Sequence, residues 1–234
     1  MTRIFVAPDQ LVAGELVVRG DEHHYLARVR RARPGDAVEL VDGAGRRATA
    51  TIARLSEGET TLVAGPAETI IAAPPWVRAL VPLIKGERMD ACIEKLVEVG
   101  VDAIVVWPAA RSVARLEDSR RDARLARYRT IAQAAARQSG RAQVPEVALA
   151  AGLAAAVTGL PPGLRLVLDP TSDAALDPGD ATDITLVSGP EGGLTPDEHE
   201  RLAGFAPVGL GPRVLRAETA PMVAVALIRA MTRS

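Results

Sequence analysis

Two hydrophobic patterns divide this chain of 234 residues. In residues 1–70, apolar and polar positions alternate in short runs such as RIFVA and GELVVRG, and Asp42-Gly43 and Gly45 interrupt the longest run. Alternation with period two, broken by Asp-Gly signals, is typical of β-hairpins. Several such runs within about seventy residues predict a small β-barrel or sandwich in this part of the chain.

One helical stretch, DEHHYLARVRR (21–31), is predicted to interrupt these strands. Its apolar residues Tyr25, Leu26 and Val29 are expected to face the core. This leaves three basic residues near the surface: Arg28, Arg30 and Arg31. The segment AETIIAAPP that ends this region has the composition of a linker. We therefore predict two domains, 1–70 and 76–234, joined by residues 71–75.

After Trp76 the apolar residues form continuous runs, VRALVPLI and DAIVVWPA. Strands without alternation are expected in a parallel sheet that is covered on both faces. Between the two runs lies MDACIEKLVEVG, which places apolar residues on one stripe of a helix: Met89, Cys92, Ile93, Leu96 and Val97. The helix is expected to end at Gly100, and the whole segment predicts a βαβ unit.

The rest of the chain continues this mixture of helices and buried strands. Helices are predicted from about Ser119 to Gln138, in the Ala-rich segment 149–160 and in APMVAVALIRAM (220–231). Three more buried strands are predicted in LRLVLD, DITLVSG and PVGLG. The second domain is therefore predicted to have an α/β fold.

The composition is that of a globular protein of the cytoplasm. Hydrophobic residues make up 48% of the chain, and a single cysteine, Cys92, excludes an internal disulfide framework. The N-terminus has no signal pattern, and the apolar run 220–228 is too short to cross a membrane. We expect no metal site, because His23 and His24 have no cysteine or third histidine near them.

The charges are segregated along the chain, although the net charge is only −1. Residues 166–200 contain nine acids and no Lys or Arg. Residues 111–141 contain three acids and nine arginines: Arg111, Arg115, Arg120, Arg121, Arg124, Arg127, Arg129, Arg137 and Arg141. A basic segment of this kind is typical of a surface that contacts nucleic-acid phosphates, and a solvated helix face is an equally good interpretation.

A glycine turn, LVSGPEGGLTPDE (186–198), follows one predicted strand and precedes a helix. This order is typical of phosphate-binding turns. Here, however, Thr195, Pro196 and Glu198 form a capping box that satisfies amides of the helix, and Glu191 and Asp197 would repel a phosphate. A neutral or cationic ligand is favoured. The alternative is a tight connection that needs glycine only for its backbone angles.

A second glycine turn, GLGPRVLRAETAPM (209–222), follows another strand and precedes the last helix, with Thr219 as its expected cap. A third turn follows LRLVLDP. Turns at the carboxyl ends of parallel strands line one crevice, which is where open α/β sheets bind ligands. We predict a pocket there that is made largely of backbone.

Five segments stand in order behind HHYLARVRRARPGDAVELVDG: VPLIKGERM, IEKLVEVGVDAIVVWPAARSV, IAQAAARQSGRAQVPEV, LVSGPEGGLTPDE and LGPRVLRAETA. Together they resemble the ribosomal small-subunit RNA methyltransferase E family, which belongs to the SPOUT class of S-adenosylmethionine-dependent enzymes. The resemblance implies a PUA-like barrel for RNA, an α/β domain with a C-terminal trefoil knot, and a homodimer. The implied activity is methylation of N3 of one uridine of 16S rRNA in the assembled small subunit.

The resemblance also implies which residues form the site. The cofactor is expected to lie against Leu168, Asp169, Gly189, Pro190, Glu191, Gly192, Gly193, Leu210, Gly211, Val214, Leu215 and Arg216. RNA contacts are expected from Arg28, Arg30, Arg31, Arg111, Arg137 and Arg141.

Catalysis requires stabilisation of the negative charge that spreads onto the uracil carbonyls, and we expect Arg216 to provide it. An ion pair with Glu218 is the alternative interpretation of Arg216. Lys85 and Arg88 are second choices. The sequence does not identify the base that removes the N3 proton, and Glu191 and Glu218 are the candidates for it.

Two other function classes stay open on the sequence: an RNA-binding relative without catalytic activity, and a nucleotide-dependent α/β enzyme. The nucleotide-dependent enzyme is disfavoured, because the glycine turns lack both the G-x-G-x-x-G spacing and the G-K-[ST] ending.

Overall fold

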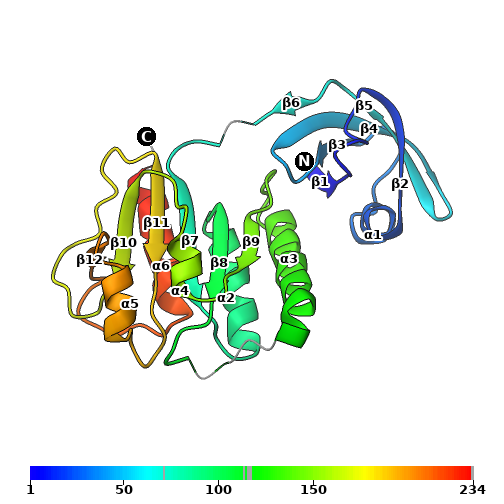
Figure 1. Cartoon of the computed structure of the whole chain (residues 1–234). Helices are drawn as coiled ribbons and strands as arrows, with labels where there is room; N and C mark the ends of the chain where they lie inside the picture. Colours follow the sequence, from blue (N-terminus) through cyan, green and yellow to red (C-terminus); the bar gives the residue numbers. More distant parts are fainter. Residues whose placement is uncertain (71, 113, 115–117, 233–234) are drawn as a thin grey trace. The chain divides into compact units, whose positions relative to one another are not determined.

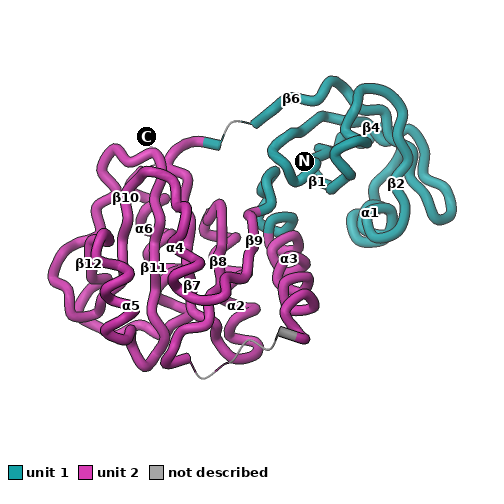
Figure 2. The backbone as a smooth tube through the Cα atoms, in the orientation of Figure 1, with its two compact units in different colours: residues 1–72, 136–144 teal, residues 73–135, 145–234 magenta. Residues whose placement is uncertain are grey.

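The computed structural model describes residues 1–70, 72–112, 114 and 118–232. They form two compact units, coloured separately in Figure 2: residues 1–72 with 136–144, and residues 73–135 with 145–234. The chain passes from the first unit to the second after residue 72, within the segment 71–75 that was predicted as a linker. Residue 71 of this segment lies outside the described residues. Residues 136–144 join the first unit, although they stand far along the chain.

The first unit contains a six-stranded sheet in which the strands follow the path β1-β3-β4-β5-β2 and β6 pairs with β4 (Figure 1). The strands are β1 (Thr2–Phe5), β2 (Gly14–Arg19), β3 (Ala37–Val41), β4 (Arg46–Ser56), β5 (Glu59–Ala64) and β6 (Glu68–Thr69). The pairs β3-β4 and β4-β5 are antiparallel hairpins, as the alternation predicts, whereas β1 pairs with β3 in parallel.

The sheet of the first unit is not a closed barrel, and that prediction is wrong. Among the described residues no strand pairing joins β1 to β2, the two ends of the path. Alternation with period two predicts strands and the face that each side chain takes. Closure depends in addition on strand tilt and stagger, which a single strand's pattern does not contain.

The predicted helix of the first unit begins as α1 (Gly20–His24) and continues as a π-helical turn, η1 (Tyr25–Val29). Leu26 is fully buried in the core, and Tyr25 packs against that core. Val29 is 61% exposed, so its predicted core position is wrong. The π-helical turn is wider than an α-helical turn, and the changed angular spacing turns Val29 outward. The three arginines expected at the surface are exposed: Arg28, Arg30 and Arg31.

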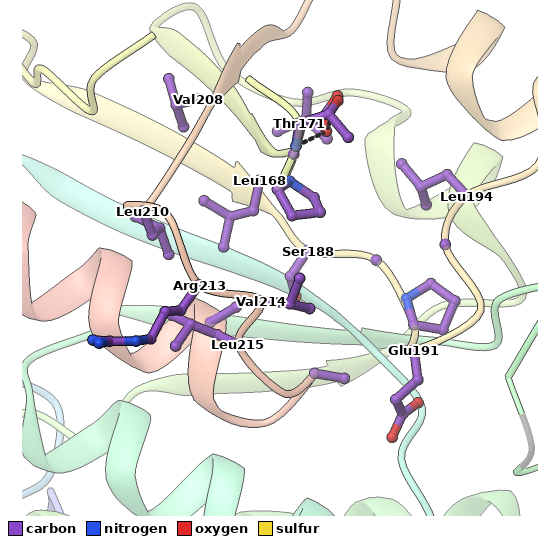
Figure 3. A pocket seen from close by; sticks show the side chains of 18 of the residues that line it. Leu168, Thr171, Ser188, Glu191, Leu194, Val208, Leu210, Arg213, Val214 and Leu215 are labelled. Atoms are coloured by element: carbon purple, nitrogen blue, oxygen red, sulfur yellow. Dashed lines mark hydrogen bonds between the residues drawn. The ribbon is translucent and has the colours of Figure 1, made fainter. Parts of the chain in front are cut away.

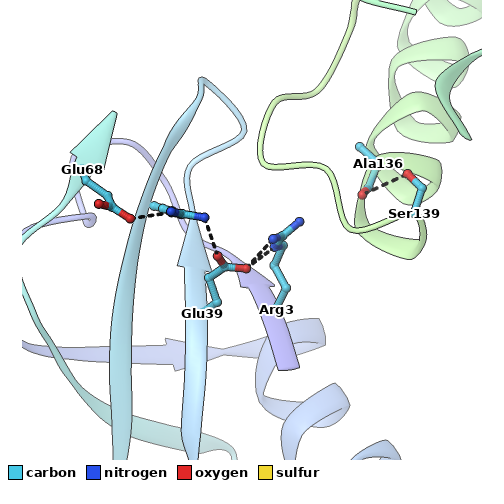
Figure 4. Close-up of polar contacts among 6 residues, drawn as sticks. Arg3, Glu39, Glu68, Ala136 and Ser139 are labelled. Carbon is cyan, nitrogen blue, oxygen red and sulfur yellow. Dashed lines mark hydrogen bonds and ion pairs between the residues drawn. The ribbon is translucent and has the colours of Figure 1, made fainter. Parts of the chain in front are cut away.

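Ion pairs neutralise part of the charge on the sheet of the first unit (Figure 4). Glu39 on β3 accepts a hydrogen bond from Arg3 on β1, and its other carboxylate oxygen lies 3.8 Å from Arg47 Nη1. Arg47 in turn pairs with Glu68 on β6. These contacts tie three strands and the short β6 together across the sheet.

The segment 136–144 packs on the first unit through specific contacts. Arg137 pairs with Glu22 at 2.6 Å, and its guanidinium lies 5.4 Å from the centre of the Phe5 ring. Burial raises the pKa of Glu22, and the charge of Arg137 opposes this shift. The amide of Val144 donates to the carbonyl of Gly43 at 2.9 Å. The Ser139 hydroxyl contacts the Ala136 carbonyl in the last turn of the preceding helix (Figure 4).

The second unit is an α/β fold around a parallel sheet with the strand order β12-β10-β11-β7-β8-β9. Its strands are β7 (Trp76–Pro82), β8 (Ala103–Trp107), β9 (Glu146–Leu149), β10 (Leu164–Leu168), β11 (Asp183–Val187) and β12 (Ala206–Val208). The sequence predicted all of these strands except β9. That strand has only four residues at the sheet edge, and its alternating burial does not match the continuous runs of the others.

Helices cover both faces of this sheet, as Figure 1 shows. α4 (Leu153–Val157) packs with α5 (Pro196–Arg201) on one face, and α2 (Glu87–Glu98) packs with α6 (Thr219–Met231) on the other. The predicted stripe of α2 is buried throughout, and burial raises the pKa of Cys92 to about 12. α3 (Arg121–Gln138) follows a short 3-10 turn, η2 (Asp118–Arg120). Within the described residues, none of the helices has the length and hydropathy that a membrane span needs.

The C-terminal helix α6 is anchored by Arg229. Its guanidinium donates to the carbonyls of Pro75 at 2.6 Å and Gly100 at 2.9 Å, and it forms an ion pair with the buried carboxylate of Asp102. Asp102 also accepts the amide of Val77 at 2.8 Å. One side chain therefore connects α6 to the starts of β7 and β8.

The expected cap of α6 is wrong. Thr219 is the first residue of the helix, and Glu218 occupies the cap position without a capping side-chain hydrogen bond. The amides of Thr219 and Ala220 both donate to the carbonyl of Arg216 at 2.9 Å. Because the backbone already satisfies these amides, the helix start does not depend on a capping hydroxyl.

Candidate functional site

A pocket of about 380 Å³ lies at the carboxyl ends of β10, β11 and β12 in the second unit (Figure 3). Its size is within the range of small-molecule sites. The segments that follow the three strands form its walls. Their lining residues are Val167 to Thr171, Ser188 to Glu191 with Gly193 and Leu194, and Val208, Leu210 and Gly211 with Arg213 to Leu215. His199, Ala217 and Ala220 complete the lining. The three predicted turns thus meet at one pocket.

Most residues that the resemblance assigned to the cofactor line this pocket. They are Leu168, Asp169, Gly189, Pro190, Glu191, Gly193, Leu210, Gly211, Val214 and Leu215. Two assigned residues are not among the lining residues: Gly192, which faces Arg111, and Arg216, whose side chain is 76% exposed.

The turn after β11 is shaped by its own backbone and by the helix that follows. Gly193 has φ +71° and donates to the carbonyl of Pro190 at 2.9 Å, which closes the turn in a conformation that favours glycine. The predicted capping box is present: Glu198 N donates to the Thr195 hydroxyl at 3.3 Å, and the Glu198 carboxylate accepts the Thr195 amide at 2.8 Å. Pro196 has no amide hydrogen and the amide of Glu198 is occupied by this cap, so these positions of the first turn of α5 do not offer a donor to a phosphate.

The segments after β10 and β12 are joined to each other. The amide of Gly209 donates to the Ala174 carbonyl at 2.9 Å, and a Cβ at Gly209 would lie only 2.2 Å from the Ser172 carbonyl oxygen. The Asp169 carboxylate accepts the hydroxyl of Thr171 at 2.7 Å and its amide at 2.8 Å. These hydrogen bonds lower the pKa of Asp169, so an anionic group lies in the pocket wall.

The polar residues of the pocket that were missed on the sequence include Ser188 and His199. Ser188 is buried, and its hydroxyl has no hydrogen-bond partner among the described residues. Ser188 directly follows a strand, and this pattern predicted the turn. Nothing in the sequence indicated a particular role for the Ser188 hydroxyl. His199 lines the pocket from α5, because the first turn of that helix faces the crevice.

Of the residues predicted to take part in catalysis, Glu191 lines the pocket, and ion pairs connect Glu191, Arg88, Glu218 and Arg216. Glu191 lines the pocket and pairs with Arg88 at 2.9 Å, and Arg88 also lies 3.5 Å from Glu218. Arg216 Nη1 lies 4.0 Å from Glu218. Lys85 is exposed after β7 and is not a lining residue. Arg88 therefore connects the turn after β11 to the segment between β12 and α6.

The arginine-rich segment makes many contacts within the second unit. Arg121 and Arg129 donate to the carbonyls of Leu149 and Val147, so they cover backbone of the edge strand β9. Such covering suppresses pairing of a sheet edge with another chain. Arg127 pairs with Asp90 in α2. Arg120, Arg124 and Arg141 also have interactions, while Arg115 lies outside the described residues. In the part of the chain that is described, no cluster of His, Cys, Asp or Glu is arranged to hold a metal.

Comparison with known proteins identifies both parts of the chain. Residues 72–229 match the RNA methyltransferase domain family, and residues 18–63 match the RNA methyltransferase PUA domain. The ribosomal RNA small subunit methyltransferase E of Mycobacterium bovis is 37% identical over 233 residues, which cover 92% of this chain and 86% of the relative. The protein of the same name from Bacillus subtilis is 30% identical, and the aligned region covers 92% of this chain and 90% of that protein.

The solved structures agree with the sequence relatives. The crystal structure of a ribosomal RNA small subunit methyltransferase E from Neisseria gonorrhoeae bound to S-adenosyl methionine superposes with a TM-score of 0.84 at 30% identity, and covers 99% of this chain and 98% of that chain. The structure of a methyltransferase from Legionella pneumophila with bound SAM superposes with a TM-score of 0.82 at 27% identity, and the alignment covers 98% of both chains. Because the domain match spans more than half of the chain and the relatives align along nearly all of it, the chain belongs to the ribosomal RNA small subunit methyltransferase E family.

Proposed function

We propose that this protein transfers a methyl group from S-adenosylmethionine to N3 of one uridine of 16S rRNA in the assembled small ribosomal subunit. The observation that carries the proposal is the pocket at the three turns, in a chain whose family relative from Neisseria gonorrhoeae was solved with S-adenosyl methionine. The N3 position, the uridine and the assembled subunit come from the family resemblance.

The residues of the pocket suit S-adenosylmethionine, which has no phosphate and carries a sulfonium cation. Asp169 and Glu191 supply negative charge, and the apolar side chains of Leu168, Leu210 and Leu215 suit an adenosine. The partnerless hydroxyl of Ser188 offers a hydrogen bond to a polar ligand atom, because a buried hydroxyl without a partner is costly. NAD and ATP are not expected to bind, since the acids would repel their phosphates and the capping hydroxyl of Thr195 already occupies the Glu198 amide.

When it is bound, S-adenosylmethionine supplies the methyl group, and the protein aligns the reacting atoms and stabilises charge. Arg216, exposed in the segment between β12 and α6, would stabilise negative charge on the uracil carbonyls. Arg88 and Lys85 follow β7 and are the second choices. Glu191 at the pocket mouth, or Glu218 beside it, would accept the N3 proton.

The proposed activity predicts one product that can be identified. Small subunits from a strain that lacks the enzyme, incubated with the protein and S-adenosylmethionine, are expected to gain N3-methyluridine in 16S rRNA. Nucleoside mass spectrometry would identify it. A methylated nucleoside of another kind would contradict the target, and cofactor binding without any methylation of subunits would favour the alternative of a catalytically silent RNA-binding relative.

The exposed arginines of η1 and the residues after it are proposed to contact RNA phosphates. Arg28 and Arg31 are exposed, and Arg30 donates to the Thr2 hydroxyl at 3.1 Å. Arg141 and Arg137 remain proposed contacts, although Arg137 pairs with Glu22. Phosphate contacts position RNA without reading its sequence, and the target base must leave its stack to be methylated.

Removing these charges is expected to change the salt dependence of RNA binding. The double variant Arg28→Ala/Arg31→Ala should bind small subunits more weakly and lower the slope of log affinity against log salt by about one to two, because each lost phosphate contact contributes about one. Cofactor affinity should not change. The matched control is Arg19→Ala/Arg54→Ala, which removes two exposed arginines that pair with Glu59. Equal slopes for both double variants and the unmodified protein would contradict the role of Arg28 and Arg31.

The homodimer, the trefoil knot and the cytoplasmic location implied by the resemblance also stay proposals. A dimer with its active sites at the subunit interface is supported by the exposed apolar residues Leu227 and Met231 on α6 and Val214 beside the pocket. Association would remove these side chains from water. Sedimentation velocity at micromolar concentration would reveal the dimer, and a monomer under these conditions would contradict it.

A further inference from the structure

Arg111 contacts the glycine turn of the pocket from outside. Its Nη1 atom donates to the carbonyl of Gly192 at 3.1 Å and to the carbonyl of Leu194 at 3.3 Å. A Cβ at Gly192 would lie 3.0 Å from the Cβ of Arg111 and 3.3 Å from its carbonyl oxygen. The missing side chain of Gly192 thus lets the turn approach the chain segment that follows β8.

A second contact joins the same two segments. The Glu198 carboxylate accepts the amide of Ala110 at 2.9 Å through one oxygen and the amide of Thr195 at 2.8 Å through the other. Glu198 is buried, so these hydrogen bonds are shielded from water. The capping carboxylate of α5 and the guanidinium of Arg111 therefore hold the turn 189–195 against residues 110–111 at two neighbouring points.

We propose that Arg111 is a positioning residue for the cofactor-binding turn and does not act as an RNA contact. The turn has two sides: Gly189, Pro190, Glu191 and Gly193 line the pocket, whereas Gly192 faces Arg111. By holding two carbonyls on the outer side, Arg111 fixes the orientation of the peptide groups that form the inner wall. The inference rests on the proposed function in one respect, namely that the pocket binds S-adenosylmethionine.

The chemistry of arginine suits this role. A guanidinium is planar, so the two N–H groups of Arg111 Nη1 keep a fixed direction toward the two carbonyls. A lysine carries the same charge on a flexible chain, and its rotating ammonium has no such fixed plane. Fixing the turn before the ligand arrives reduces the ordering cost of binding, which improves affinity without a new ligand contact.

The test compares Arg111→Lys and Arg111→Met with the unmodified protein in calorimetric titrations with S-adenosylhomocysteine. Arg111→Met should weaken binding about tenfold, the cost of losing hydrogen bonds from a charged donor, and Arg111→Lys should recover only part of this loss. Hydrogen exchange of the turn 189–195 without ligand should become faster in both variants. The salt slope of subunit binding should stay the same. The control is Arg127→Met, which removes an equal charge from the pair with Asp90 on the protein surface.

The outcomes separate this inference from the proposed function. If the unmodified protein does not bind S-adenosylhomocysteine, the proposed function fails. The hydrogen exchange rates of the turn 189–195 in the variants and in the unmodified protein still test the contact of Arg111, because that measurement needs no ligand. If the unmodified protein binds and Arg111→Met lowers the salt slope with unchanged cofactor affinity, Arg111 is an RNA contact and the inference is overturned. Full affinity in Arg111→Lys would also overturn the inference, because the guanidinium geometry would then not be what positions the turn. Thermal melts would show whether Arg111→Met folds. If it does not fold, hydrogen exchange of the turn 189–195 is measured in Arg111→Lys and Glu198→Gln instead. Exchange rates that equal those of the unmodified protein in both variants would overturn the inference.

Discussion

Replacing Arg216 with alanine is expected to lower kcat for methyl transfer by about 100-fold, the usual cost of removing one donor that stabilises transition-state charge. The Kd for S-adenosylmethionine should change little, because the side chain is 76% exposed and is not a pocket-lining residue. An interaction that forms mainly in the transition state affects the rate without affecting ground-state binding. Single-turnover methylation of small subunits and calorimetric titration measure the two quantities.

A suitable control for Arg216 is Arg201→Ala, which removes an exposed arginine from α5. This variant should keep both kcat and Kd. If Arg216→Ala lowers the rate and the cofactor affinity by the same factor, Arg216 is a binding or folding residue, and its weak pair with Glu218 becomes the better explanation of its position.

Replacing Arg229 with methionine is expected to reduce the free energy of unfolding by about 3–5 kcal/mol, the cost of breaking a buried ion pair from one side. The side chains are 20% exposed for Arg229 and 8% exposed for Asp102. Methionine fills much of the same volume, so the loss comes from the ion pair between Arg229 and Asp102 and from the hydrogen bonds to the carbonyls of Pro75 and Gly100. Urea denaturation followed by circular dichroism would measure it.

Arg127→Met provides the comparison for this stability measurement. Arg127 also forms an ion pair, with Asp90, but its side chain is 64% exposed. Exposed ion pairs contribute at most about 1 kcal/mol, so the free energy of unfolding of this variant should be close to that of the unmodified protein. Similar losses for both variants would mean that burial of the Asp102 pair does not decide its contribution.

Several parts of this protein could be predicted because their cause is local. The stripe of Met89, Cys92, Ile93, Leu96 and Val97 identified a buried helix, since an apolar stripe must be covered wherever it packs. The capping box of Thr195 and Glu198 formed as predicted, because both partners stand within one turn of the chain. The pocket turns could be located because each follows a buried strand of a parallel sheet.

Other features required contacts between residues that are distant in the sequence. Gly192 and Arg111 stand 81 positions apart, and only the packing of the two segments shows that Gly192 faces away from the pocket. The open sheet of the first unit depends on which strand edges meet, and the pattern of one strand does not specify its neighbour. Val29 turned outward because of a π-helical turn that its apolar neighbours did not reveal.

The arginines of residues 111–141 show the difference between what the sequence predicts and what the fold determines. The order of residues establishes that residues 111–141 are rich in arginine and that the glycine turn 189–193 stands before an acidic helix start. That Arg121 and Arg129 cover the edge strand β9, and that Arg111 holds the turn, follows from the packing of the folded chain. A guanidinium binds whichever carbonyl or carboxylate lies within about 3 Å, and folding selects that neighbour from distant parts of the chain.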